Sequence, residues 1–326
     1  MIITRTPLRV SLAGGGTDLP AFYSNSFGAV VSFAIDKYVT VAVSEKFDGR
    51  TRVSYSMTEN VDTPNQLQHD IIRESLEHFD VKGVEVVTVS DIPGEGTGMG
   101  SSSVLAVGLC QALRKWTGGR VNIHPSFLAE EAYAIERLRC GHPCGKQDHF
   151  AAAYGGLHSY HFMNNEDVIV RNLEFSDEVK HFLEADLMLF WTGRTRKADD
   201  ILREQESNLR YEDTAKFLAV QLRDLAVDLE TELLEEKFNN IAYYLHEGWM
   251  LKKRLAKGIS DPALDEIYQA ALGAGAGGGK LLGSGGGGFF LFAGCWNHQN
   301  QIERALGLRR VYFKIERQGT RIVYNG

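Results

Sequence analysis

The segment Asp91–Ser103 reads DIPGEGTGMGSSS, with glycines at alternate positions from 94 to 100 and three serines at its end. The valine-rich run Val84–Val89 before it predicts a strand, and the apolar run Val104–Trp116 after it predicts a helix. Glycine lets a backbone approach a ligand closely, and free amides at a helix start attract anions. The order strand, glycine loop, helix therefore favours a polyphosphate site, with an ordinary capped connection as the alternative.

Two other phosphate-binding patterns do not fit this chain. The pattern G-x-x-x-x-G-K-[ST] of P-loop NTPases does not occur in the sequence. The pattern G-x-G-x-x-G occurs twice between residues 273 and 288, but there it follows a helical run and enters the apolar strand Phe289–Phe292. A dinucleotide-binding loop needs the reverse order, so nicotinamide chemistry is disfavoured.

Composition and charge restrict the class of protein. The chain has 326 residues, of which 44% are hydrophobic and 24% charged, as in folded globular proteins. Its formal net charge of −7 provides no global positive field, so we expect no nucleic-acid or membrane partner and expect bound phosphate to be held locally. Four cysteines do not make a disulfide scaffold, and the N-terminus lacks the apolar core of a signal peptide. We therefore expect a cytoplasmic protein.

One cysteine cluster raises the question of a metal. Cys140, His142 and Cys144 stand close together in the sequence, and His149 follows. These residue types could form a zinc site. Structural zinc sites, however, usually draw on two separated pairs of ligands, and the sequence has no second pair of this kind. Metal ligation by cysteine is therefore not favoured.

The order of predicted elements indicates an α/β chain with two domains. Strands are predicted at Leu8–Ala13 and Ala29–Val43, and helical spacing appears over 65–79 and 125–138. A polar stretch begins at Met163, and the second half is mainly helical, with leucine stripes that fit core packing. We place the domains at residues 1–162 and 163–326, with a cleft between them.

Four segments, in order along the chain, resemble the GHMP kinases, small-molecule kinases named for galactose, homoserine, mevalonate and phosphomevalonate. They are 7–18, 93–103, 136–150 and 282–288. The resemblance spans nearly the whole chain. It implies an α+β arrangement, with an ATP-binding domain like domain 2 of ribosomal protein S5 at residues 1–162 and a ferredoxin-like domain at residues 163–326.

The resemblance also implies roles for individual residues. Asp148 would accept the proton of the acceptor hydroxyl, Arg9 would lie between that hydroxyl and the γ-phosphate, and Ser102 and Glu136 would bind Mg²⁺. The residues implied to bind the ATP phosphates are Gly94, Gly96, Gly98, Gly100, Ser101, Ser102 and Ser103. From the residues alone, Asp148 can instead cap a helix, Glu136 can pair with a neighbouring arginine, and Arg9 can be a charge at a strand edge.

The acceptor is suggested by a departure from the galactokinase pattern Gly-Glu-His-Thr-Asp. This chain has Gly14-Gly-Gly-Thr-Asp18, so the side chains at 15 and 16 are missing and a larger group can fit beside the sugar. In this respect the sequence most resembles the D-glycero-D-manno-heptose 7-phosphate kinases, which phosphorylate the anomeric C1 hydroxyl to give the 1,7-bisphosphate. The residues expected to bind the substrate are Gly15, Gly16, Thr17, Asp18, Arg194, Arg196, Lys197, Lys280, Ser284, Gly285 and Gly286.

Two alternatives remain at this stage. One is an anomeric kinase of an unphosphorylated sugar, similar to fucokinases or galactokinases. The other is a non-catalytic sensor of sugar and nucleotide, which would be expected to lack Asp148 or Glu136; both are present. The expected partners are ATP and a sugar phosphate, and the number of chains in the assembly is left open, with a homodimer as one option.

Overall fold

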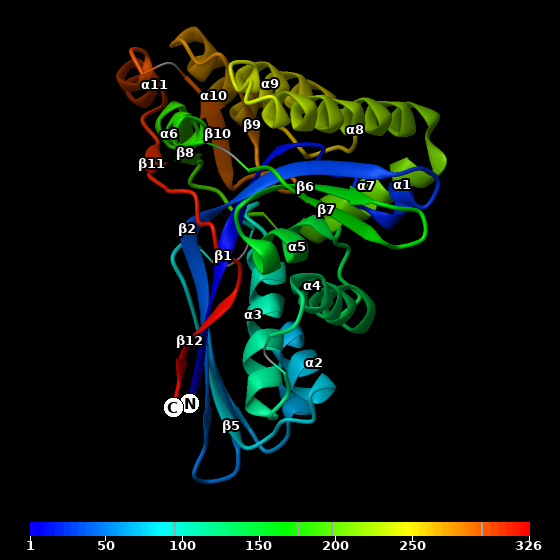
Figure 1. The fold of residues 1–326 in the computed structure, drawn as a ribbon, viewed down its shortest axis with the longest axis vertical. Helices are drawn as coiled ribbons and strands as arrows, with labels where there is room; N and C mark the ends of the chain where they lie inside the picture. The colour runs from blue at the N-terminus through cyan, green and yellow to red at the C-terminus, as the bar shows by residue number, and fades with distance from the viewer. Residues whose placement is uncertain (94–95, 121, 175, 197, 295) are drawn as a thin grey trace.

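The structure is a computed structural model that describes residues 1–93, 96–120, 122–174, 176–196, 198–294 and 296–326. Two of the residues predicted to bind ligand, Gly94 and Lys197, lie outside this described part. Figure 1 shows an elongated molecule whose two termini lie side by side. The amino group of Met1 donates a hydrogen bond of 2.9 Å to the carbonyl of Gly326.

The larger of two sheets has eight strands. Six follow the order β12-β1-β2-β5-β3-β4, while β6 pairs with β2 and β7 pairs with β6. All pairings in it are antiparallel except that of β3 with β5. Its strands are β1 (Ile2–Ala13), β2 (Gly28–Glu45), β3 (Thr51–Ser54), β4 (Thr58–Val61), β5 (Val84–Ser90), β6 (Leu157–Phe162), β7 (Val168–Asn172) and β12 (Arg321–Asn325). The long strands β1 and β2 are buried over most of their length, so they form the centre of the fold.

Helices cover this sheet on the side where the glycine loop lies. α3 packs on β1 and β2, and α4 and α5 pack on α3 (Figure 1). The apolar residues of α3 are buried on all sides, as expected for a central helix. The helical segments of this half are α1 (Pro20–Tyr23), η1 (Pro64–Gln66), α2 (Asp70–His78), α3 (Ser101–Trp116), α4 (Pro125–Tyr133), the π-helix η2 (Ala134–Arg139) and α5 (Gln147–Tyr154).

The second sheet has four antiparallel strands in the order β11-β8-β10-β9. They are β8 (Leu187–Trp191), β9 (Gly278–Leu281), β10 (Phe289–Ala293) and β11 (Arg309–Val311). The helices beside them are α6 (Asp177–Asp186), α7 (Ala198–Tyr211), α8 (Asp213–Leu234), α9 (Ile241–Lys252), α10 (Pro262–Gly273) and α11 (Gln299–Leu306). α8 and α9 also contact β1, so the two halves meet over the central strands.

The structure confirms the mixed α/β class and most of the predicted elements. Two features differ from the sequence-based expectation. The predicted helix over 125–138 is α-helical only to Tyr133 and continues as a π-helix, and the polar stretch after Met163 contains the edge strand β7. The larger sheet takes in β7 and β12, which both follow residue 162, and the division of the chain at that residue stays a prediction.

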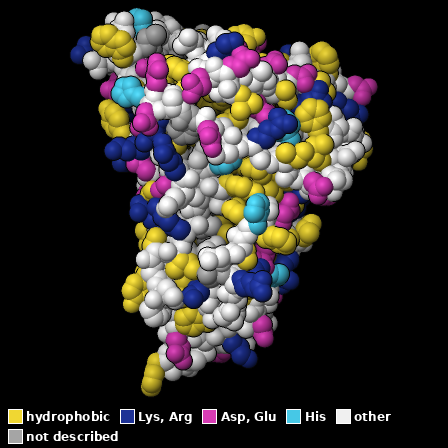
Figure 2. Space-filling model, in the orientation of Figure 1, with side chains coloured by type: hydrophobic (Ala, Val, Ile, Leu, Met, Phe, Trp, Pro, Cys, Tyr) yellow, Lys and Arg dark blue, Asp and Glu magenta, His cyan; other side chains and the backbone are white. Residues whose placement is uncertain are grey.

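The helices and the surface of the described part of the chain can be compared with what a bilayer would require of them. No helix there is both long and apolar enough to cross a bilayer. On the face presented in Figure 2, basic and acidic side chains are interspersed.

The aromatic core of the second sheet yields a stability prediction. Phe290 is fully buried and packs its ring against Trp249, Tyr268 and Phe292. We expect Phe290→Ala to lower the free energy of unfolding by about 3–5 kcal/mol, measured by urea denaturation. The matched variant Phe127→Ala removes a ring that is 72% exposed and should change it by less than about 0.5 kcal/mol. Equal losses in the two variants would contradict the buried position of Phe290.

Candidate active site

A buried ion pair joins three of the motifs. Arg9, on β1, is 2% exposed, and its Nε donates a hydrogen bond of 2.6 Å to Oδ1 of Asp148 on α5. Its Nη1 donates a second bond of 2.6 Å to the carbonyl of Gly98. The Asp148 side chain is 20% exposed, so it reaches the edge of the buried region. One arginine therefore fixes the glycine loop and the carboxylate relative to the central strand.

The glycine loop lies close to both the carboxylate and the second glycine loop. Gly100 precedes α3 with a φ of 75°, and a Cβ atom on it would lie 2.8 Å from Oδ2 of Asp148. Gly98 touches the backbone of Leu282 and Gly283 so closely that neither loop could carry a side chain at this contact. Gly98 and Gly283 thus permit the two loops to meet backbone to backbone, and Gly100 leaves room for the side chain of Asp148.

Asp18 is buried beside this pair. Its Oδ1 accepts hydrogen bonds from the Gly16 amide at 3.0 Å and from Nε2 of Gln147 at 2.9 Å, and its Oδ2 accepts one from the Gln147 amide at 3.2 Å. Burial, and then the charge of Asp148, raise the pKa of Asp18, while the amides oppose that shift. Thr17 is fully buried and donates to the carbonyls of Gly14 and Ala29, so in this structure it shapes the loop.

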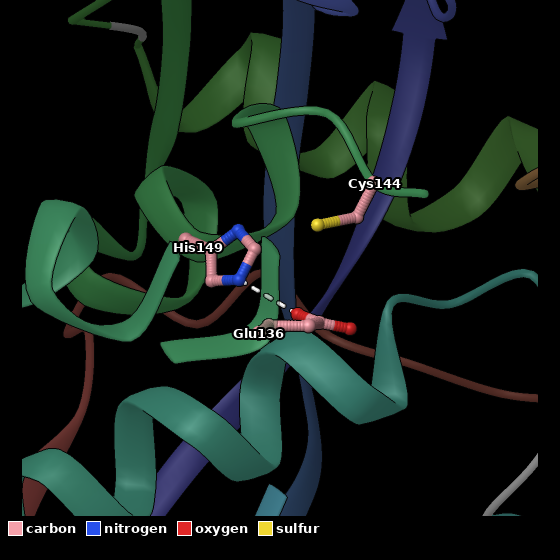
Figure 3. Close-up of side chains that lie close together, drawn as sticks. All are labelled: Glu136, Cys144 and His149. Atoms are coloured by element: carbon pink, nitrogen blue, oxygen red, sulfur yellow. Dashed lines mark ion pairs between the residues drawn. The ribbon is translucent and has the colours of Figure 1, made fainter. Parts of the chain in front are cut away.

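The π-helix η2 presents Glu136 to a group of polar side chains. Its Oε2 lies 2.7 Å from Nε2 of His149 (Figure 3) and accepts a hydrogen bond of 2.7 Å from Ser103. Nδ1 of His142 lies 4.0 Å from its Oε1. Burial alone would raise the pKa of Glu136, but the two histidines and Ser103 lower it to about 2. Glu136 is therefore a buried carboxylate that stays charged. Within the part of the chain that is described, its serine partner is Ser103, whereas Ser102 is exposed.

The cysteine cluster of the sequence is only partly assembled. Cys144 lies near Glu136 and His149, with one ligand atom of each within 4.8 Å of the others (Figure 3). Cys140 is not part of this group. Burial raises the pKa of the Cys144 thiol well above its ordinary value.

The other residues predicted to bind substrate lie around the second glycine loop. Arg194 pairs with Asp261 at 2.6 Å, and Arg196 donates to the carbonyl of Gly258 at 3.3 Å. Lys280 is 3% exposed on β9 and donates to the carbonyl of Leu12 at 3.4 Å. The remaining predicted residues Ser284, Gly285 and Gly286 follow β9, where Gly285 packs on Ile259 and Gly286 on Arg196.

Sequence reasoning missed several polar residues of this site. Lys252 on α9 is 6% exposed and donates a hydrogen bond of 2.6 Å to the carbonyl of Gly283. Gln205 on α7 is 1% exposed and lies against Gly16. Gln147 and His149 complete the set, as partners of Asp18 and Glu136. No motif marks Lys252 or Gln205, because both come from helices that are far in the sequence from the first glycine loop.

Comparisons with known proteins define the family. Residues 67–156 match the GHMP kinases N terminal domain, and residues 229–312 match the GHMP kinases C terminal domain. The chain is 32% identical to the D-glycero-alpha-D-manno-heptose 7-phosphate kinase of Campylobacter jejuni, over 89% of this chain and 88% of the relative. The chain belongs to the GHMP kinase family, has its two-domain fold, and is a phosphotransferase.

Solved structures support the same fold over the whole chain. A D-glycero-D-manno-heptose 1-phosphate kinase from Bacteroides thetaiotaomicron is similar with a TM-score of 0.80 at 25% identity, covering all of both chains. A Lactococcus lactis galactokinase complexed with galactose is similar with a TM-score of 0.77 at 15% identity, covering 98% of this chain and 94% of that one. The second likeness concerns the fold alone.

The contact between Gly100 and Asp148 leads to a prediction. Gly100→Ala should displace the carboxylate, because the new methyl group would lie 2.8 Å from Oδ2, and lower the rate of ADP release by about 10²-fold. The matched control is Gly118→Ala, which has the same φ of 75° but nothing within 4 Å of the added atom. Crystal structures of both variants check whether the Arg9 pair is lost only in the first. Unchanged turnover in Gly100→Ala would argue against a catalytic place for this carboxylate.

Proposed function

We propose that this protein is an ATP-dependent sugar kinase that phosphorylates the anomeric C1 hydroxyl of D-glycero-D-manno-heptose 7-phosphate and yields the 1,7-bisphosphate. The observation that carries the proposal is the Arg9–Asp148 pair, which lies between the glycine loop and the buried Asp18. The proposed phosphate loop, the proposed base and a carboxylate that can accept hydrogen bonds from acceptor hydroxyls therefore lie close together. The 32% identity to a heptose 7-phosphate kinase supports the choice of sugar.

The nucleotide phosphates would lie on the loop that ends at Ser103. Three of its described glycines have positive φ, and the chain then enters α3, whose first amides carry the positive end of the helix dipole. The proposed phosphate ligands among the described residues are Gly96, Gly98, Gly100, Ser101, Ser102 and Ser103. Gly94 stays a prediction from the sequence.

Magnesium fits the oxygen donors at the start of α3. Mg²⁺ prefers hard oxygen ligands, and Glu136 offers a carboxylate whose pKa is held at about 2. Its Oε2 is bonded to Ser103 and His149, and Nδ1 of His142 lies 4.0 Å from Oε1, so a cation would bind Oε1 beside that imidazole. We propose Glu136 and the exposed hydroxyl of Ser102 as the Mg²⁺ ligands. When bound, the ion would neutralise charge on the phosphates.

The chemistry assigned to this chain is one proton transfer and one charge neutralisation. Asp148 would take the proton of the acceptor hydroxyl as its oxygen forms a bond to the γ-phosphorus, while the bond from that phosphorus to the bridging oxygen breaks and ADP leaves. Arg9, held 2.6 Å from Asp148, would stabilise the charge on the moving phosphoryl group. The carboxylate of Asp18 would hold acceptor hydroxyls in line with this group.

A second candidate acceptor is an unphosphorylated sugar. It is favoured by one observation: Arg194 is already paired with Asp261, and Arg196 is bonded to a carbonyl, so these cations are not free for a substrate phosphate. The two similar proteins also differ in name, since one is a heptose 7-phosphate kinase and the other a heptose 1-phosphate kinase. A sensor without activity is disfavoured, because Asp148 and Glu136 are both present, Asp148 paired with Arg9 and Glu136 with His149.

A substrate panel tests the acceptor. Purified protein with ATP and Mg²⁺ should release ADP with heptose 7-phosphate, measured in a coupled assay, and phosphorus NMR should show the new phosphate on C1. Free heptose, fucose, galactose and heptose 1-phosphate are the comparison acceptors. Turnover on free sugars without turnover on heptose 7-phosphate would remove the proposed acceptor and leave the kinase assignment in place.

A substitution tests the proposed base. Asp148→Asn keeps the shape of the side chain but cannot take a proton, so kcat should fall by about 10²–10⁴-fold while the affinity for an ATP analogue is retained. The control is Asp213→Asn, whose side chain is fully exposed on α8 and which should behave as wild type. A kcat for Asp148→Asn within a few-fold of wild type would show that another group accepts the proton.

A further inference from the structure

Polar side chains from four separate elements surround the two glycines that lack the side chains of the galactokinase pattern. A Cβ atom on Gly15 would lie 3.4 Å from Nζ of Lys252, 3.6 Å from Oγ of Ser11 and 3.8 Å from Nε2 of Gln147. At Gly16 the added atom would lie 2.3 Å from Nε2 of Gln205, so this amide packs directly against the glycine. These groups come from β1, α5, α7 and α9, so the chain builds a polar wall at the place where side chains are missing.

Several atoms of this wall have no hydrogen-bond partner. Among the described residues none bonds to Oγ of Ser11, to Oε1 of Gln147 or to Nε2 of Gln205, although all three atoms are buried. A buried polar atom left unpaired costs about 1–3 kcal/mol, and such atoms are rare in folded proteins. Three of them around one pair of glycines indicate a polar ligand that would satisfy them.

The charge of the same region is unbalanced. Lys252 and Lys280 are 6% and 3% exposed, and among the described residues their ammonium groups donate hydrogen bonds to the carbonyls of Gly283 and Leu12. No carboxylate of the described residues lies within 4.0 Å of either ammonium group, since neither lysine takes part in a salt bridge there. Burial lowers the pKa of Lys252 to about 8, with the charge of Asp18 acting against that shift. Buried cations without a paired anion are costly, so an anionic ligand would stabilise this arrangement.

We propose that Lys252 and Gln205 bind a phosphate group carried by the acceptor, at the place where Gly15 and Gly16 lack side chains. Both groups offer hydrogen-bond donors, which suit the acceptor oxygens of a phosphate. Ser11 and Gln147 bind the neighbouring hydroxyls. This inference rests on the proposed kinase function and moves phosphate recognition from the exposed Arg194–Arg196 segment to a buried site.

A structural role for Lys252 makes a different prediction. If the ammonium group served only to offset the buried charge of Asp18, its loss would weaken binding of every acceptor equally. If it binds the acceptor phosphate, its loss affects only acceptors that carry that phosphate. The comparison of a sugar phosphate with its dephosphorylated form therefore separates the two roles.

The test uses the full chain with heptose 7-phosphate and free heptose as acceptors. Lys252→Met should raise the KM for the phosphorylated acceptor by about tenfold or more, leave the KM for ATP within about twofold, and leave the KM for free heptose unchanged. Lys252→Arg, which keeps the charge, should recover part of the loss. Gln205→Leu should change the same KM in the same direction, by a smaller factor.

The control is Lys253→Met, and Arg196→Ala tests the exposed Arg194–Arg196 segment as the competing phosphate site. Lys253 follows Lys252 in the chain but is part-exposed and lies 3.5 Å from Asp265, so its loss should leave both acceptors unaffected. Equal KM changes for the two acceptors in Lys252→Met would overturn the proposal, as would a large change in Arg196→Ala without one in Lys252→Met. Thermal unfolding of each variant shows whether the fold is intact.

A binding experiment separates failure of this inference from failure of the proposed function. Inorganic phosphate, followed by phosphorus NMR line broadening, should bind to the wild type and bind about tenfold or more weakly to Lys252→Met, whether or not any sugar is turned over. A wild type that turns over no sugar but shows this difference would remove the proposed kinase substrate and keep the anion site. Equal phosphate binding by the two proteins would remove the anion site alone.

Discussion

The ion pair between Arg9 and Asp148 is the contact on which the rest of the site depends. A buried arginine is stable only if a carboxylate and further acceptors take its charge and its protons, and Asp148 and the Gly98 carbonyl do both. Because Arg9 belongs to the central strand β1, whose neighbours are fixed by the sheet, the positions of the glycine loop and of α5 follow from it. Removing either partner would leave a buried charge unpaired.

Glycine has a second role at this junction, which is to allow close approach. Gly98 from the first half contacts Gly283 from the second so closely that neither position could carry a side chain. The two loops therefore pack directly against each other. The second half then contributes Lys252 and Lys280 behind these loops. The basic side chains Arg9, Lys252 and Lys280 are therefore all buried near this junction, and an anion bound there would favour their charged forms.

The sequence predicted the parts of the site that lie within short motifs. The strand before the glycine loop and the helix after it follow from the residue pattern, whereas Arg9 and Asp148 were named through the resemblance of their segments to a known family. The structure brings those two residues together. Ser102 and Ser103 are adjacent on a helix, about 100° apart around its axis, so sequence alone could not tell which one contacts Glu136. The π-helix that turns Glu136 inward has no sequence signal of its own.

Long-range contacts account for what the sequence missed. Lys252 and Gln205 come from helices α9 and α7, where no motif marks them, and only tertiary packing buries them. The most direct test of the account is a crystal structure with a non-hydrolysable ATP analogue, Mg²⁺ and the sugar phosphate. The account predicts the triphosphate on the amides of residues 96–103 and the acceptor hydroxyl within hydrogen-bond distance of Asp148. A nucleotide bound elsewhere, or an acceptor oxygen remote from Asp148, would contradict it.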